Sequence, residues 1–204
     1  TMAASIELPS GERMLRDPGA CRDLAEGLAE AMRLHVADVR RRFPRAQVVV
    51  QWDEPGVVAV LEGSIGTASG LSRYAPVEAS VVEMSLGTVV RGVDALAGVH
   101  CCAQRPPIAL FRRAGAGFVS VDLRDGRVDD EQLGAAWEGG VGILAGSVPS
   151  IGTGRWSDAE ASRPVREAAD RLGLGDARHL ASVVVTPTCG LAGATPAWAR
   201  TAYA

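Results

Sequence analysis

The sequence contains neither lysine nor asparagine, and only 4% of its residues are aromatic. All 21 basic residues are therefore arginines, set against 24 acidic residues, which gives a formal net charge of −3. The one basic cluster, Arg40 to Arg42 with Arg45, falls where a helix is expected to end and complements its dipole. Elsewhere arginines and acidic residues are interspersed, so the sequence does not predict the basic face that nucleic-acid binding requires.

Long apolar runs and a signal-like start are also missing. No segment reaches the roughly 18 consecutive apolar residues of a membrane span. The first residues, Thr1 to Ser5, show no basic region followed by an apolar stretch. We therefore expect a cytoplasmic protein with no membrane partner. A chain of 204 residues, 47% of them hydrophobic, holds material for one sizeable core or for part of a larger one, so we treat residues 1–204 as one domain.

Cysteine is scarce, and its placement matters more than its number. The four residues Cys21, Cys101, Cys102 and Cys189 are too few and too scattered to predict a disulfide framework in a chain of this length. In a reducing compartment they are either small buried side chains or metal ligands.

Strand-like and helix-like segments alternate along the chain. Five apolar runs predict strands, at Ala46–Trp52, Val99–Cys102, Gly117–Leu123, Gly140–Ala145 and Ala181–Thr186. Helical spacing and start signals predict helices at Asp17–Phe43, Val77–Leu96, Pro106–Arg113, Asp129–Trp137 and Ser157–Leu174, and from Pro196 onward. The first strand is a continuous β-branched run, a pattern typical of a strand buried on both faces. This alternation predicts a parallel α/β sheet with right-handed crossovers.

Polar residues with catalytic or ligand chemistry follow the predicted strands. They are Asp53, His100 with Cys102, Asp122, Ser147 and Cys189. In a (β/α)8 TIM barrel the carboxyl ends of the strands surround one mouth, whereas in an open sheet they spread along an edge. Convergence of all five favours the barrel. A full barrel needs eight strands and about 250 residues, so this chain supplies an incomplete one.

A zinc site is the strongest functional hypothesis. If Val99 to Cys102 is extended, His100 and Cys102 point the same way and Cys101 points into the opposite layer. Asp122 and Cys189 follow later strands in the same manner, and one imidazole, two sulfurs and one carboxylate make a four-coordinate Zn²⁺ site. The alternative at each position is structural: a buried histidine, small buried cysteines, and a carboxylate that starts a turn.

Four motifs resemble the catalytic, C-terminal domain of vitamin-B12-independent (cobalamin-independent) methionine synthases. They are Asp53-Glu54-Pro55 after the first strand, His100-x-Cys102 on the second, an acid at Asp122 on the third, and Pro187-Thr188-Cys189-Gly190 on the last. Their order and spacing match through nearly all 204 residues, most closely to the shorter, single-domain relatives. The resemblance implies a TIM barrel in which this chain supplies the fourth to eighth strands.

The resemblance also implies an activity and a site. The family is a methyltransferase of methionine biosynthesis (5-methyltetrahydropteroyltriglutamate–homocysteine S-methyltransferase), in which zinc activates the homocysteine thiol for attack on a methylated folate. It implies that His100, Cys102, Asp122 and Cys189 bind zinc. It further implies that Asp53 binds the substrate amino group and has a catalytic role, and that Glu54, Thr67 and Ser69 contribute to the substrate site. Ser147 falls where the family has its general acid, a histidine, and Asp122 replaces a glutamate.

Two other functions remain open at this stage. One is a catalytically silent relative that binds zinc or acts as a scaffold, and the other is a uroporphyrinogen-decarboxylase-like barrel without zinc. Five parallel strands cannot close into a barrel, because strand number and shear fix the curvature. We therefore expect two open edges, at Val48–Trp52 and Val183–Thr186, a chain that is a fragment, and self-association or another segment covering those edges.

Overall fold

The computed structural model describes residues 1–203, and of Asp125 only the backbone. These residues fall into two compact units. Unit 1 consists of Thr1–His100 with Leu110–Gly117, and unit 2 consists of Cys101–Ala109 with Phe118 to the end of the described chain. The boundary therefore falls within a strand, between His100 and Cys101.

Helices and strands alternate as the sequence predicts. In chain order they are α1 (Met2–Ser5), η1 (Met14–Arg16), α2 (Pro18–Arg42), β1 (Val49–Asp53), α3 (Val57–Glu62), α4 (Ala79–Arg91), β2 (Leu96–Cys101), α5 (Ile108–Arg113), β3 (Phe118–Asp122), η2 (Arg124–Gly126), α6 (Asp130–Glu138), β4 (Gly142–Val148), α7 (Asp158–Leu172), α8 (Ala177–Leu180), β5 (Val183–Pro187) and α9 (Pro196–Tyr203). The five strands form a sheet in the sequential order β1-β2-β3-β4-β5. The predicted α/β class is confirmed, and a five-stranded parallel sheet in this order is consistent with part of a TIM-barrel-like fold.

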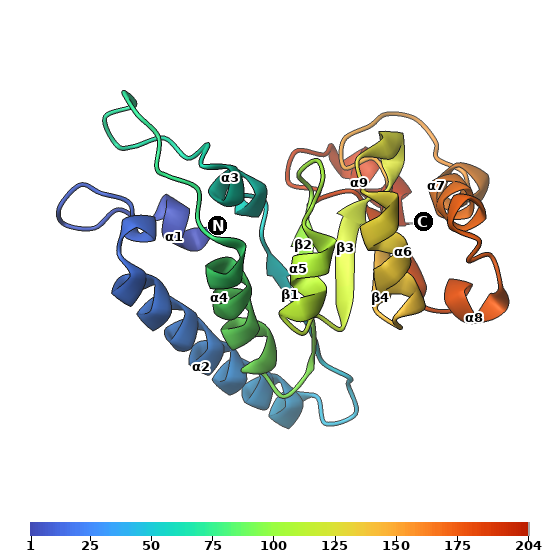
Figure 1. Ribbon diagram of the computed structural model, residues 1–204. Helices are drawn as coiled ribbons and strands as arrows, with labels where there is room; N and C mark the ends of the chain where they lie inside the picture. The colour runs from blue at the N-terminus through green and yellow to red at the C-terminus, as the bar shows by residue number, and fades with distance from the viewer. Residues whose placement is uncertain (204) are drawn as a thin grey trace. The chain divides into compact units, whose positions relative to one another are not determined.

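Unit 1 is built on a long capped helix. Asp17 accepts hydrogen bonds from the backbone N–H groups of Gly19 and Ala20 at 2.9 and 3.0 Å, and Pro18 occupies the first turn, where no intrahelical donor is needed. Helix α2 packs against α4, and Figure 1 shows the two helices side by side. In this unit β1 pairs in parallel with β2, from Val49 opposite Leu96 to Asp53 opposite His100.

Unit 2 contains three parallel strands with helices packed on them. β3 pairs with β4, and β4 pairs with β5 with a bulge between Gly146 and Val148. Every residue of β3 is buried, as the apolar run predicts for a central strand. Helix α7 packs on β4 and begins with the predicted capping box, in which the Ser157 hydroxyl and the Glu160 carboxylate each bind the other's backbone N–H.

Three local predictions are wrong. The helix expected over Val77–Leu96 ends at Arg91, and Leu96 begins β2. Helix α3 lies between the first predicted strand and the helix expected from Val77, where the sequence predicts no helix. The strand predicted to be buried on both faces, β1, has exposed side chains at alternate positions, including Val49, because β1 ends the strand order.

Candidate metal centre

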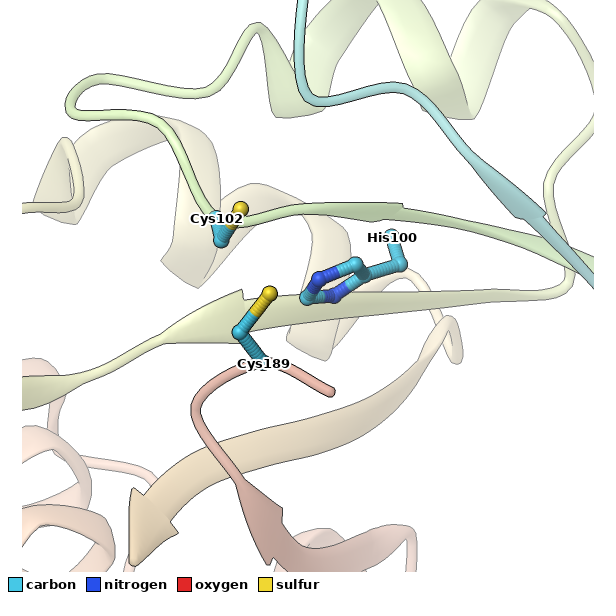
Figure 2. Close-up of side chains that lie close together, drawn as sticks. All are labelled: His100, Cys102 and Cys189. Carbon is cyan, nitrogen blue, oxygen red and sulfur yellow. The ribbon is translucent and has the colours of Figure 1, made fainter. Parts of the chain in front are cut away.

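One imidazole and two sulfurs converge at the carboxyl ends of the strands. One ligand atom each from His100, Cys102 and Cys189 lies within 4.8 Å of the others. Figure 2 shows the side chains of His100, Cys102 and Cys189 lying close together. The structure therefore brings together three of the four residues that the sequence suggests as zinc ligands.

Strand β2 and the residue after it position the first two side chains. His100 is the second-last residue of β2 and is buried, and Cys102 follows the last. Cys101, between them, is fully buried and is not part of the ligand group. The alternation of side chains along an extended segment accounts for this arrangement.

The third side chain is positioned by the segment that follows β5. The backbone N–H of Thr188 donates to the Val148 carbonyl at 2.8 Å, and the buried Thr188 hydroxyl accepts from the backbone N–H of Ser150 at 3.3 Å. These bonds extend the pairing with β4 beyond the end of β5 at Pro187. Cys189 comes next, so its backbone starts from an anchored position.

Gly146 makes this anchoring possible. A Cβ atom at residue 146 would lie 2.8 Å from the Val121 carbonyl oxygen, 2.9 Å from Cα of Thr188 and 3.2 Å from Cα of Asp122. Separations this short are not tolerated by backbone atoms, so only glycine lets the ends of β3 and β4 and the segment before Cys189 approach so closely.

The three donors fit a zinc ion. Tetrahedral zinc binds sulfur at about 2.3 Å and imidazole nitrogen at about 2.0 to 2.1 Å, so two sulfurs that share one ion lie roughly 3.8 Å apart. The three ligand atoms lie within 4.8 Å of one another, so a movement of at most about 1 Å would bring them to that spacing. Two thiolates would balance the charge of the dication, and mixed nitrogen and sulfur ligands are typical of zinc sites.

The structure differs from the sequence-based expectation at Asp122. This residue is the last of β3 and its side chain is buried, but it is not part of the ligand group. Its carboxylate accepts hydrogen bonds from the backbone N–H of Arg124 at 3.0 Å and from Nε and Nη2 of the same residue at 3.1 Å each. Nε of Arg127 lies 3.8 Å from Oδ2 of Asp122. Sequence reasoning missed these two arginines, whose only signal is their position just after the carboxylate.

The acidic pair that follows β1 has two different environments. Asp53 is exposed, accepts a hydrogen bond from Nε2 of Gln51 at 2.8 Å, and lies opposite His100 in the strand register. Glu54 accepts a hydrogen bond from the Thr1 hydroxyl at 2.8 Å, and its backbone N–H donates to the His100 carbonyl at 2.8 Å. Asp53 is therefore the member of the pair whose carboxylate is accessible.

Ser147 lies at the bulge in β4 and is fully buried. Its hydroxyl has no hydrogen-bond partner among the described residues. By contrast, Thr67 and Ser69 lie in an exposed turn, where their hydroxyls are 3.1 Å apart and Thr67 also contacts Ser72. The catalytic role expected for Ser147 and the substrate contacts expected for Thr67 and Ser69 stay predictions.

Comparison with known proteins gives a likeness of fold. No protein-family model matches the sequence, and no curated protein matches it. A solved structure of a B12-independent methionine synthase from Shewanella sp. W3-18-1, in complex with selenomethionine, is similar to this chain with a TM-score of 0.63 and 14% sequence identity. The likeness covers 90% of this chain and 51% of that one, so this chain spans about half the length of the synthase. At this identity the comparison establishes a related fold.

Among the described residues, no helix is long and apolar enough to cross a membrane.

Proposed function

We propose that this chain is the zinc-binding portion of a methyltransferase-like protein that activates a substrate thiol, as in vitamin-B12-independent methionine synthases. The observation that carries the proposal is the convergence of His100, Cys102 and Cys189 within 4.8 Å. The similarity of fold to a B12-independent methionine synthase supports it independently. Zinc bound there would act as a Lewis acid that lowers the pKa of a substrate thiol and holds it as a thiolate near neutral pH.

The proposal assigns two tasks to residues of this chain, metal binding and substrate binding. His100, Cys102 and Cys189 hold the ion, and Asp53 binds the substrate amino group with its accessible carboxylate. In the transfer, the substrate thiol loses its proton, its sulfur forms a bond to the methyl carbon, the bond between that carbon and the donor atom breaks, and the donor atom takes up a proton that balances the one lost by the thiol. A methylated folate is the donor that the family resemblance suggests.

We further propose that the chain corresponds to the C-terminal portion of a barrel domain. Its length relative to the similar synthase, about half, and the sequential order of five strands support this. The remaining strands of such a barrel would cover β1 and β5, the two ends of that order. In their absence a second copy of the chain would serve the same purpose.

Metal analysis followed by thiol titration tests the function. Protein purified under reducing conditions without chelator should carry one zinc per chain. Cobalt(II) substituted for zinc reports each new sulfur ligand through its charge-transfer absorption, so adding homocysteine should intensify that band. Absence of stoichiometric metal would contradict the proposal and favour a barrel that works without zinc.

A second candidate function is supported by one observation. Ser147 occupies the strand end where a proton donor is expected, but it is fully buried, and an alcohol is a poor acid near neutral pH. A relative that binds zinc and thiols but transfers no methyl group would show this combination. Methyl transfer from a methylated folate to homocysteine, measured on the loaded protein, distinguishes the two.

A further inference from the structure

We infer that Asp122 is not the fourth metal ligand of this chain: Arg124 and Arg127 hold its carboxylate, and the fourth coordination position is kept for the thiolate of the substrate. This inference rests on the proposed zinc site and specifies how that site admits its substrate. It also separates this chain from the four-ligand arrangement that the family resemblance implies.

Both oxygens of the Asp122 carboxylate have hydrogen-bond partners. Both oxygens accept from the guanidinium of Arg124, and Oδ1 also accepts from the backbone N–H of Arg124. Because Arg124 is only two residues from Asp122, their contact restricts the rotation of few backbone bonds and costs little conformational entropy. The Asp122 side chain is 7% exposed, so water cannot easily replace any of these partners, and releasing the carboxylate would leave a buried charge without compensation.

The backbone of Asp122 is nevertheless close to the segment that carries Cys189. Cα of Asp122 and Cα of Thr188 would lie 3.2 and 2.9 Å from the same Cβ position at Gly146. The carboxylate is turned toward Arg124 although its backbone lies near Thr188, the residue before Cys189. An aspartate side chain is short, so it cannot reach far while Arg124 holds it.

The charges at the end of β3 favour the binding of an anionic ligand. Zinc with two thiolates and one neutral imidazole carries no net charge. One carboxylate with two guanidinium groups, Asp122 with Arg124 and Arg127, carries a net charge of +1. A third sulfur that arrives as a thiolate is therefore stabilised, whereas a bound carboxylate would occupy its place. The chemistry fits a small thiol that loses its proton on binding.

Zinc affinity of the full chain tests the inference without any activity measurement. Asp122→Asn keeps the size of the side chain and an oxygen acceptor, and should change the zinc dissociation constant by less than about threefold. Cys189→Ser removes a proposed ligand and should weaken binding more than the roughly 10- to 100-fold loss typical of outer-shell changes. A loss in Asp122→Asn as large as that in Cys189→Ser would overturn the inference while leaving the zinc site intact.

A second measurement detects the open position directly. Cobalt(II)-loaded Asp122→Asn should have the same visible spectrum as the cobalt(II)-loaded unmodified chain, and homocysteine should add the same new sulfur band to both. Arg124→Met removes the guanidinium hydrogen bonds to both carboxylate oxygens, so its spectrum should shift, and the double variant Arg124→Met with Asp122→Asn should revert. A spectral change in Asp122→Asn alone would refute the inference. Failure of the unmodified chain to bind either metal would instead remove the proposed function itself.

Discussion

Asp53 and His100 lie directly opposite each other in the parallel register of β1 and β2. The backbone beyond them stays paired, since the N–H of Glu54 donates to the His100 carbonyl at 2.8 Å. An exposed carboxylate is thus held beside a proposed metal ligand by backbone hydrogen bonds and not by the metal.

Asp53→Ala should therefore weaken homocysteine binding and leave zinc content unchanged. The loss expected for one charge-assisted hydrogen bond is about 1.5 to 3 kcal/mol, or roughly 10- to 150-fold in affinity. Calorimetric titration of the zinc-loaded protein gives the affinity, and metal analysis gives the occupancy. Asp94→Ala, which removes an exposed carboxylate paired with Arg40, is the matched control. Loss of zinc in Asp53→Ala would show that Asp53 is a ligand.

Gly146→Ala should damage stability and metal binding together. The added methyl group would meet backbone atoms of β3 and of Thr188 at 2.8 to 3.2 Å, and forcing such contacts costs about 1 to 3 kcal/mol. Chemical denaturation measures the first effect and zinc titration the second. Gly190→Ala is the control, because a Cβ atom there would have nothing within 4 Å although the residue adjoins Cys189. Equal behaviour of the two variants would contradict the crowding seen at Gly146.

The cysteines should react with iodoacetamide at different rates. Cys189 is exposed, whereas Cys101 is fully buried. Burial, and to a smaller extent the carboxylate of Asp17, raises the pKa of the Cys21 thiol, whose sulfur donates to the Met14 carbonyl at 3.3 Å. Because the thiolate is the reactive form, mass spectrometry of the metal-free chain should show alkylation of Cys189 before Cys21. Added zinc should protect Cys189 and leave the rate at Cys21 unchanged, and equal protection of both would argue against a specific site.

The ion pair between Asp130 and Arg171 should make a small, acid-sensitive contribution to stability. Hydrogen bonds from Arg171 lower the pKa of the Asp130 carboxyl. A lowered pKa in the folded state stabilises the protein above the unfolded value, about 3.9, and this contribution is lost as the pH falls through the folded value. Both side chains are about half exposed, so solvent screening limits the effect to a few tenths of a kcal/mol.

Denaturation of the unmodified chain and Asp130→Asn at pH 7 and at about pH 2 measures this contribution. The free energies of unfolding of the two proteins should differ at pH 7 and be equal at the acidic pH. A difference that persists in acid would mean that the substitution acts through packing and not through charge.

The exposed valines of β5 should promote self-association. Val184 and Val185 are 56% and 43% exposed on a strand that ends the sheet order, and an open strand edge with apolar side chains pairs readily with another chain. Sedimentation velocity should show association that grows with concentration, and Val184→Glu should reduce it. Val81→Glu, at an exposed valine of α4, controls for added charge alone. A chain that stays monomeric throughout the concentration range would contradict this prediction.

Local signals predicted much of the fold because they act within a few residues. Asp17 before Pro18, and Ser157 with Glu160, form the caps that their spacing indicates. Helix α3 was missed because its sequence, Val57–Glu62, is rich in β-branched residues. Its usable signal was Gly63, which ends the helix in the left-handed conformation at φ 67°. The burial of β1 was misjudged because a run of apolar residues does not tell whether a strand is central or at an edge.

The sequence predicts the part of the candidate site that depends on where the strands end. His100, Cys102 and Cys189 converge because parallel strands bring their carboxyl ends to one side, which the order of motifs already implied. Asp122 lies at the expected strand end, but its carboxylate accepts hydrogen bonds from the nearby Arg124. Pairing with Arg124 depends on the turn after β3, whose geometry no periodic pattern encodes.

The sequential order of the strands has a consequence for biosynthesis. Each strand pairs with the one made just before it, so the sheet can grow in the order in which the ribosome delivers it, without waiting for a distant segment. Cys189 lies beyond the fifth strand and is the last of the three proposed ligands to emerge. A nascent chain that stops before residue 189 would already contain the paired strands but would lack one of the two sulfurs. The ability to retain zinc would then be acquired at the end of synthesis, and a pulse of metal given to ribosome-bound chains of increasing length would show when.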